Sequence, residues 1–142
     1  IKPDNLLVFS LDANEKVNAK LTDFGSSRNI NLLMTNMTFT KGIGTPKFMA
    51  PEVLKQEKYT KAADVYSFAI TMYETFSWFE AYRKDQFKFP WKIAEFINQE
   101  NRLPRIDPIQ ENQFDVIEAC WKHNPKSRMG IEEVVQRLQE IV

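Results

Sequence analysis

The feature that most constrains this chain is the stretch from Thr22 to Glu52, which begins with Asp23-Phe24-Gly25 and ends with Ala50-Pro51-Glu52. An alternating apolar segment precedes the first triplet, so its aspartate is expected where a strand ends. A carboxylate supplies the hard oxygen ligands that Mg²⁺ prefers, and glycine allows backbone angles that other residues resist. The triplet therefore predicts a metal ion held beside a hinge, with the glycine providing the turn.

Two segments before this triplet have the composition of paired strands. Residues 5–10 are rich in Leu, Val and Phe, residues 16–22 alternate apolar and polar side chains, and a polar turn separates them. Because a hairpin returns the chain to its starting point, Asn5 is expected to lie beside Asp23. An amide oxygen and a carboxylate would then converge on one divalent cation. The alternative is that Asn5 only caps the loop and that Lys2 is a solvated surface charge.

A third motif, Ile1-Lys2-Pro3-Asp4-Asn5, stands upstream of the triplet. The order of the three motifs resembles the catalytic loop, metal-binding triplet and substrate-loop end of eukaryotic-type protein kinases. The resemblance covers residues 1–142 and implies a partial kinase domain, with residues 23–52 as the activation segment. The implied fold is α+β and mostly α-helical: the large (C-terminal) lobe, with a small β-hairpin carrying the metal ligands and no N-terminal lobe. The chain starts one residue after the position of the family's catalytic Asp.

The resemblance also assigns roles to single residues. Asn5 and Asp23 would hold the Mg²⁺ ions that bridge the phosphates of ATP, so ATP and Mg²⁺ are the expected cofactors. Lys2 would offset charge on the transferring phosphoryl group, and Thr45 would hydrogen-bond the catalytic Asp and Lys. The sequences around Lys2 and Thr45 differ from those of tyrosine-specific kinases and favour Ser or Thr of a protein substrate.

Residues 26–41 have no usable periodicity and contain several hydroxyl side chains. Connections of this length are usually functional or disordered. By resemblance this is the part of the activation segment where a phosphate could pair with arginines, and Thr38 and Thr40 are the preferred phosphorylation sites. The alternative is that they are simply hydroxyls compatible with turns.

From Thr60 the pattern becomes helical, and apolar residues recur every three or four positions. By resemblance this is the buried central helix of the lobe, and Asp64 would bind the catalytic-loop backbone from beneath. A carboxylate in a first turn also suits the helix dipole alone. The apolar positions are Val65, Phe68, Ala69, Met72, Tyr73 and Phe76.

Three further helices are expected after this one. The first starts near Phe89-Pro90-Trp91, after an irregular aromatic connection that could be a docking site but fits a satellite core cluster better. The second runs through Phe114 and Cys120, with Cys120 as a core residue and His123 in a surface turn. The last begins near Gly130, and its predicted buried stripe is Ile131, Val134, Val135, Leu138, Ile141 and Val142.

The resemblance also implies that Arg128 binds Glu52. A guanidinium can clamp a carboxylate through two parallel hydrogen bonds, and this pair would fix the substrate platform to the lobe. The run from Cys120 to Arg128 and the helix after it most resemble the tyrosine-kinase-like group of Ser/Thr kinases.

Composition excludes some classes. Lys plus Arg equals Asp plus Glu at 19 each, which gives no support for nucleic-acid binding or an electrostatic membrane anchor. No apolar run is long enough to span a bilayer. A single cysteine favours a reducing, cytoplasmic setting, and the absence of an initiating Met suggests a piece of a longer protein. The oligomeric state stays open.

We therefore expect a Ser/Thr protein kinase whose isolated 142-residue chain is inactive, because it lacks the Gly-rich loop, the ATP-gripping Lys and the catalytic Asp. One alternative is a pseudokinase that acts as a scaffold or allosteric partner, which the presence of both Asn5 and Asp23 disfavours. The other is an unrelated helical interaction domain.

Overall fold

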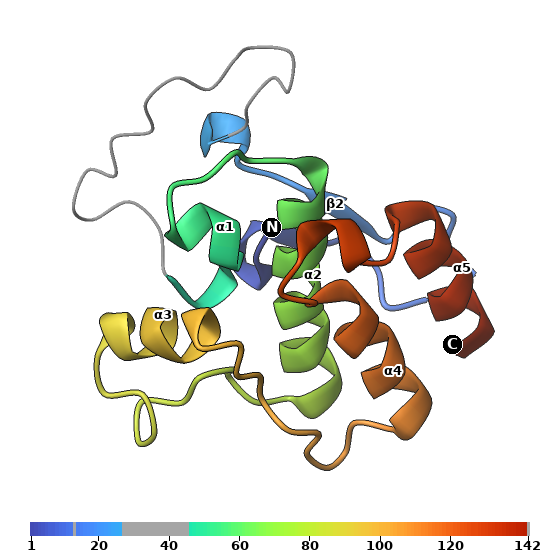
Figure 1. Ribbon diagram of the computed structural model, residues 1–142. Helices are drawn as coiled ribbons and strands as arrows, with labels where there is room; N and C mark the ends of the chain where they lie inside the picture. The colour runs from blue at the N-terminus through green and yellow to red at the C-terminus, as the bar shows by residue number, and fades with distance from the viewer. Residues whose placement is uncertain (13, 27–45, 142) are drawn as a thin grey trace.

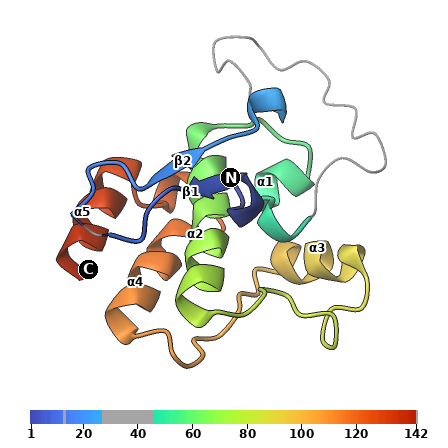
Figure 2. The same ribbon diagram turned by 180° about the vertical axis from the view of Figure 1, so that it is seen from behind.

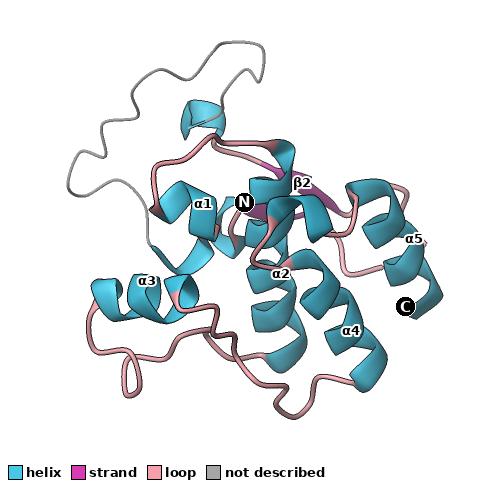
Figure 3. Cartoon of the chain, viewed as in Figure 1, coloured by secondary structure: helices cyan, strands magenta, loops and turns pink. Residues whose placement is uncertain are grey.

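A long helix, α2 (Lys61–Ser77), runs through the centre of the molecule, and the other elements pack around it (Figure 1). The computed structural model describes residues 1–12, 14–26 and 46–141. The expectation of a mostly helical α+β fold with one small hairpin is confirmed for these residues, as Figure 3 shows. The elements in chain order are η1 (Pro3–Asn5), β1 (Leu6–Val8), β2 (Ala19–Leu21), η2 (Phe24–Ser26), η3 (Pro46–Phe48), α1 (Pro51–Leu54), α2, α3 (Pro90–Asn98), α4 (Glu111–Cys120), η4 (Pro125–Ser127) and α5 (Ile131–Ile141).

Helix α2 begins and ends where its sequence predicts. Thr60 is the N-cap with extended backbone, and Trp78 closes the helix in the left-handed region, its N–H donating to the carbonyl of Glu74. Tyr66, Ala69 and Ile70 are completely buried. The burial extends around more of the helix than the single stripe that the sequence suggests, because α2 contacts both α4 and η3. Helix α2 is therefore the centre of the core, and α4 and η3 pack against it.

Helix α4 packs along α2, and α5 lies on the outer side of α4 (Figure 1). Tyr73 and Phe114 both contact Trp121, with ring centroids 5.8 and 5.9 Å apart respectively. Cys120 is completely buried, which confirms it as a core residue. Helix α3 lies on the opposite side of α2 from α5 and contacts α1 and η3.

The predicted buried stripe of α5 is confirmed at three positions and wrong at two. Val134 is completely buried and Leu138 and Ile141 pack at the margin of the core, but Ile131 and Val135 are 45% and 49% exposed. Val142 lies outside the described residues. The reason is that α5 is an outer helix that packs on α4, so only the narrow side facing α4 is covered.

The aromatic connection before α3 divides into two groups. Tyr82, Phe87 and Phe96 pack edge-to-face as the expected satellite cluster, with centroids 5.1 to 6.2 Å apart. Phe89 and Trp91, by contrast, are 41% and 60% exposed. Among the described residues, no helix is both long and apolar enough to cross a bilayer.

Candidate functional site

The hairpin register places Asn5 and Asp23 at the same end of the two-stranded ribbon. Leu6 pairs with Leu21, and the next pair outward joins Asn5 to Thr22 through a hydrogen bond of 2.8 Å from the Thr22 N–H to the Asn5 carbonyl. The Thr22 hydroxyl donates to the same carbonyl at 3.3 Å. Asp23 is the next residue, so the two predicted ligands stand one residue apart across the ribbon. Figure 2 shows this hairpin lying across α2.

The strands are shorter than the sequence predicts. The ladder covers three residues on each side, and beyond it a hydrogen bond of 2.7 Å from the Phe9 N–H to the Asn18 carbonyl continues the ribbon. The end that carries Asn5 and Asp23 is nevertheless paired, and this end matters for the site.

The turn after β2 differs from expectation in one respect. The left-handed backbone lies at Asp23, with φ of 57°, and not at Gly25. Aspartate tolerates this region better than most residues because its short carboxylate can bond locally, and here Oδ1 accepts the Gly25 N–H at 3.3 Å. A Cβ on Gly25 would lie 3.3 Å from that same oxygen. Glycine is thus favoured at this position by the close approach of the carboxylate.

The exposed carboxylate of Asp23 and the half-buried Asn5 form a donor set that fits Mg²⁺. Both supply hard oxygen ligands, and no described residue hydrogen-bonds the Asn5 side chain. In the described part of the chain, no three His, Cys, Asp or Glu side chains gather into a cation site. A cation held here would therefore need additional ligands from phosphates and water, which is the usual way Mg²⁺ is bound beside nucleotides.

Lys2 stands just before the 3-10 turn η1 that leads to Asn5. Its Nζ lies 3.9 Å from the carboxylate of Asp4, and the side chains are 42% (Lys2) and 82% (Asp4) exposed. Such a pair contributes little to stability. Among the described residues, Lys2 therefore forms only a weak ion pair, and it lies at the end of the ribbon where Asn5 lies.

Glu52 and Arg128 form a buried, two-point ion pair. Both distances between the guanidinium nitrogens and the carboxylate oxygens are 2.7 Å, and the side chains are only 1% (Arg128) and 5% (Glu52) exposed. The remaining N–H groups of Arg128 donate to the carbonyls of Lys122, Ala62 and His123. This contact between α1 and the turn after α4 is the one that the sequence predicts.

A second ion pair, which anchors the segment from Pro46 to Glu52, was not predicted. The Lys47 ammonium lies 2.6 Å from the Glu74 carboxylate, and the side chains are 14% and 13% exposed. The same carboxylate oxygen accepts the Ala81 N–H at 2.8 Å. The Ser67 hydroxyl of α2 donates to the Phe48 carbonyl at 2.7 Å. The only sequence signal for this anchor is a glutamate in the second half of the helix, and nothing in the pattern names its partner.

Asp64 lies in the first turn of α2, and its described partner is Tyr59, whose hydroxyl donates to Oδ1 at 2.6 Å. The expected contact with the catalytic-loop backbone is not seen among the residues that the structure describes. Burial, followed by the hydrogen bond to Asp64, raises the pKa of the Tyr59 hydroxyl well above its usual value. Thr38, Thr40 and Thr45 lie outside the described residues, so their predicted roles stay predictions.

Comparison with known proteins identifies the family. Residues 1–138 match the protein kinase domain family. The probable serine/threonine-protein kinase gdt4 of Dictyostelium discoideum is 33% identical over 145 residues. The match covers 100% of this chain and 8% of that protein. Mitogen-activated protein kinase kinase kinase 7 of Drosophila melanogaster is 33% identical over 149 residues, covering the whole chain and 19% of that protein. The probable serine/threonine-protein kinase drkC of Dictyostelium discoideum is 33% identical over 142 residues, covering 98% of the chain and 18% of that protein. The chain thus spans under a fifth of the length of these relatives, and it belongs to the protein kinase domain family.

Proposed function

We propose that the chain is part of the large lobe of a serine/threonine protein kinase, which transfers the γ-phosphoryl group of ATP to Ser or Thr side chains of proteins. The observation that carries this proposal is the hairpin register, which brings Asn5 and Asp23 to one end of the ribbon. The names of the relatives, all Ser/Thr kinases or a kinase kinase kinase, support the same reaction class.

In this proposal the Asp23 carboxylate and the Asn5 amide oxygen hold Mg²⁺ with the phosphates of ATP. The metal, when bound, neutralises charge on the β- and γ-phosphates. Lys2 approaches the transferring group from the loop before Asn5, where a cation favours the charge distribution of the transition state. Thr45 would complete this set, and Thr38 and Thr40 would be the sites of regulatory phosphorylation.

The segment from Pro46 to Glu52 would form the ledge on which the substrate peptide rests. Two ion pairs hold it from opposite ends: Lys47 to Glu74 on α2, and Glu52 to Arg128 after α4. Pro51 occupies the first turn of α1, where its fixed φ suits the helix start. A rigid ledge helps this reaction because phosphoryl transfer depends on the positioning of the two reactants.

The apolar surface of the hairpin supports the assignment as one lobe of a larger domain. Leu7, Val8 and Phe9 are 49%, 61% and 61% exposed, and Val17 on the returning strand is 55% exposed. An isolated two-stranded hairpin is at best marginally stable, and exposed apolar clusters usually mark contact surfaces. The hairpin surface is therefore a place for the remainder of the kinase domain to pack.

Phosphoryl transfer to a Ser/Thr protein substrate, measured with the full-length gene product, tests the proposal. Asp23→Asn should lower kcat by about 100-fold or more, because it removes charge from an electrostatic site acting on the phosphoryl group. The matched control is Asp12→Asn, on the exposed turn of the same hairpin, which should leave kcat unchanged. The isolated 142-residue chain should show no transfer.

Two results would contradict the proposal. Full activity of the Asp23→Asn protein would remove the metal role of this residue. A full-length protein that binds partners but transfers no phosphoryl group would instead indicate a scaffold.

A further inference from the structure

Phe89 and Trp91, at the start of α3, form a stacked aromatic pair that faces solvent. Their ring centroids are 4.3 Å apart and the ring planes are 5° from parallel. Phe89 is 41% exposed and Trp91 is 60% exposed. They differ in this from the neighbouring aromatic residues Tyr82 and Phe87, which pack against each other and the core.

The backbone holds this pair in place. Pro90 is the first residue of α3, and Phe89 before it has extended backbone, with φ of −130° and ψ of 143°. Proline fixes its own φ and restricts the preceding residue to extended conformations, so the backbone that joins the two aromatic residues has few alternatives. Rigid aromatic side chains lose little conformational entropy on binding, which makes them effective anchors in interfaces.

An open groove adjoins the pair. It has a volume of about 290 Å³ and is lined by Phe87 and Phe96 at its apolar part, with Gln86, Lys92, Glu95 and Gln99 around them. Phe87 precedes the stacked pair and Lys92 follows it in the chain. The stacked rings together with the groove are called here the α3 surface, which offers apolar side chains and amide hydrogen-bonding groups.

The segment that leads into the α3 surface has an excess of cations, in a chain of zero net charge. Residues 83–92 hold four cations and one anion, a net charge of +3. Arg83 pairs with Asp85 at 3.3 Å and Lys92 with Glu95 at 2.8 Å. Lys84 and Lys88 have no carboxylate partner among the described residues, and the Lys88 ammonium lies 5.6 Å from the centre of the Phe89 ring.

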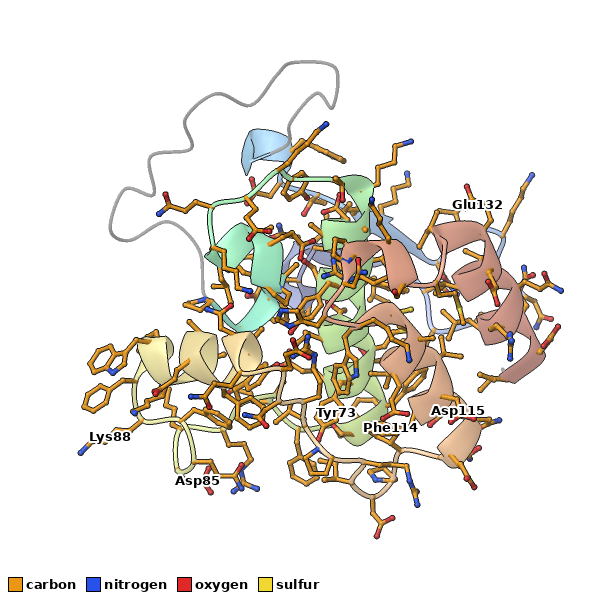
Figure 4. All side chains as sticks on the ribbon, in the orientation of Figure 1. Tyr73, Asp85, Lys88, Phe114, Asp115 and Glu132 are labelled. Atoms are coloured by element: carbon orange, nitrogen blue, oxygen red, sulfur yellow. The ribbon has the colours of Figure 1, made fainter. Side chains whose placement is uncertain are left out.

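Figure 4 shows Lys88 extending outward at the free end of α3, away from the other labelled side chains on α2 and α4. Lys88, next to Phe89 in the chain, thus projects from one corner of the molecule. The next anions along the chain are Glu80, three residues before this stretch, and Glu95, three residues after it.

We propose that the α3 surface binds an acidic peptide segment of a partner protein, with an apolar side chain of that segment against Trp91 and its carboxylates beside Lys84 and Lys88. Aromatic residues in well-packed interface centres contribute most of the binding free energy, and complementary charges set orientation and association rate. A nucleic-acid backbone or an anionic bilayer fits less well, because either presents negative charge over a much longer stretch than Lys84 and Lys88 cover, and the net charge of the chain is zero. This inference concerns binding and stands independently of phosphoryl transfer.

Selection from a random 12-residue peptide library displayed on phage, after depletion on the Trp91→Ala chain, tests the proposal. The recovered peptides should carry net negative charge together with at least one aliphatic or aromatic residue. Recovery of neutral or basic peptides, or failure to recover any peptide beyond the background of the Trp91→Ala chain, would overturn it.

Fluorescence anisotropy of the recovered peptides then measures the role of each group. Trp91→Ala should weaken binding about tenfold or more, as expected for an aromatic anchor. Lys88→Glu should also weaken binding, and the loss should be smaller at high salt, where surface charges are screened. Trp78→Ala is the matched control, because Trp78 is 84% exposed but belongs to the end of α2.

Each variant should keep the thermal unfolding midpoint of the unsubstituted chain, since the substituted side chains are exposed. Equal weakening by Trp78→Ala, or no effect of Lys88→Glu at low salt, would refute the assignment to this surface. Binding of an oligothymidylate or of phosphatidylserine vesicles that depends on Trp91, without binding of acidic peptides, would likewise refute it.

Discussion

Replacing Arg128 with alanine should be among the most destabilising single changes in this chain. The guanidinium donates five hydrogen bonds, two to the Glu52 carboxylate and three to backbone carbonyls. Its side chain is 1% exposed and that of Glu52 is 5% exposed. The alanine variant therefore leaves a buried carboxylate without its cation and three carbonyls without a donor.

The expected loss follows from these contacts. Removing one partner of a buried ion pair costs about 3–5 kcal/mol, because the remaining charge stays desolvated. The three orphaned carbonyls would add to this, although water entering the vacated space would satisfy part of them. The total is a large share of the 5–15 kcal/mol typical of a folded domain. For a chain of this size it corresponds to a fall in Tm of about 10–20 °C.

Urea unfolding followed by circular dichroism measures this loss. Arg137→Ala is the matched control, because Arg137 pairs with Glu133 at 3.6 Å on the surface of α5, where both side chains are more than half exposed. This control should cost less than about 0.5 kcal/mol. A double-mutant cycle with Glu52→Ala should show strong coupling, since either single change breaks the same pair. If Arg128→Ala were no more destabilising than Arg137→Ala, or if the cycle gave no coupling, the reasoning would be refuted.

Three further changes test other contacts. Glu74→Gln should lower the free energy of unfolding by about 1–3 kcal/mol, because it removes the charge that holds Lys47; an unchanged urea midpoint would contradict this. Tyr59→Phe should cost about 1–2 kcal/mol through the lost hydrogen bond to Asp64, and Asp64→Asn made in addition should then have little further effect if that bond is the main role of the carboxylate. Burial raises the pKa of the Cys120 thiol from 9.0 to about 12, so the folded state keeps the thiol neutral while the unfolded state ionises. Stability from this group is complete below pH 9 and is lost as the pH rises towards 12, by at most about 1.4 kcal/mol per pH unit. The urea midpoint should therefore fall above pH 9 and fall less steeply in Cys120→Ala; equal slopes would contradict the assignment.

Much of the fold was predictable because its elements carry strong local signals. The start of α3 at Pro90 matches a residue that favours the first turn, and α2 begins directly after Thr60, where the helical periodicity starts. The pairing of Glu52 with Arg128, distant in the chain, came from the family resemblance and not from any local pattern. Periodicity alone does not provide such long-range contacts.

The errors have physical causes. The stripe of α5 was overestimated because hydrophobic periodicity shows which side of a helix faces the core but not how much of that side is covered. The turn was assigned to Gly25 because glycine adopts unusual backbone angles most easily, whereas the left-handed residue is Asp23, with the help of its own carboxylate. The Lys47 to Glu74 pair was missed because neither residue has a distinctive neighbourhood in the sequence.

The most direct test of the account is a crystal structure of the full-length protein with Mg²⁺ and a non-hydrolysable ATP analogue. We predict one Mg²⁺ with both the Asn5 amide oxygen and an Asp23 carboxylate oxygen at about 2.0–2.1 Å. A structure in which these two side chains bind no common ion while the nucleotide occupies its site would contradict the account.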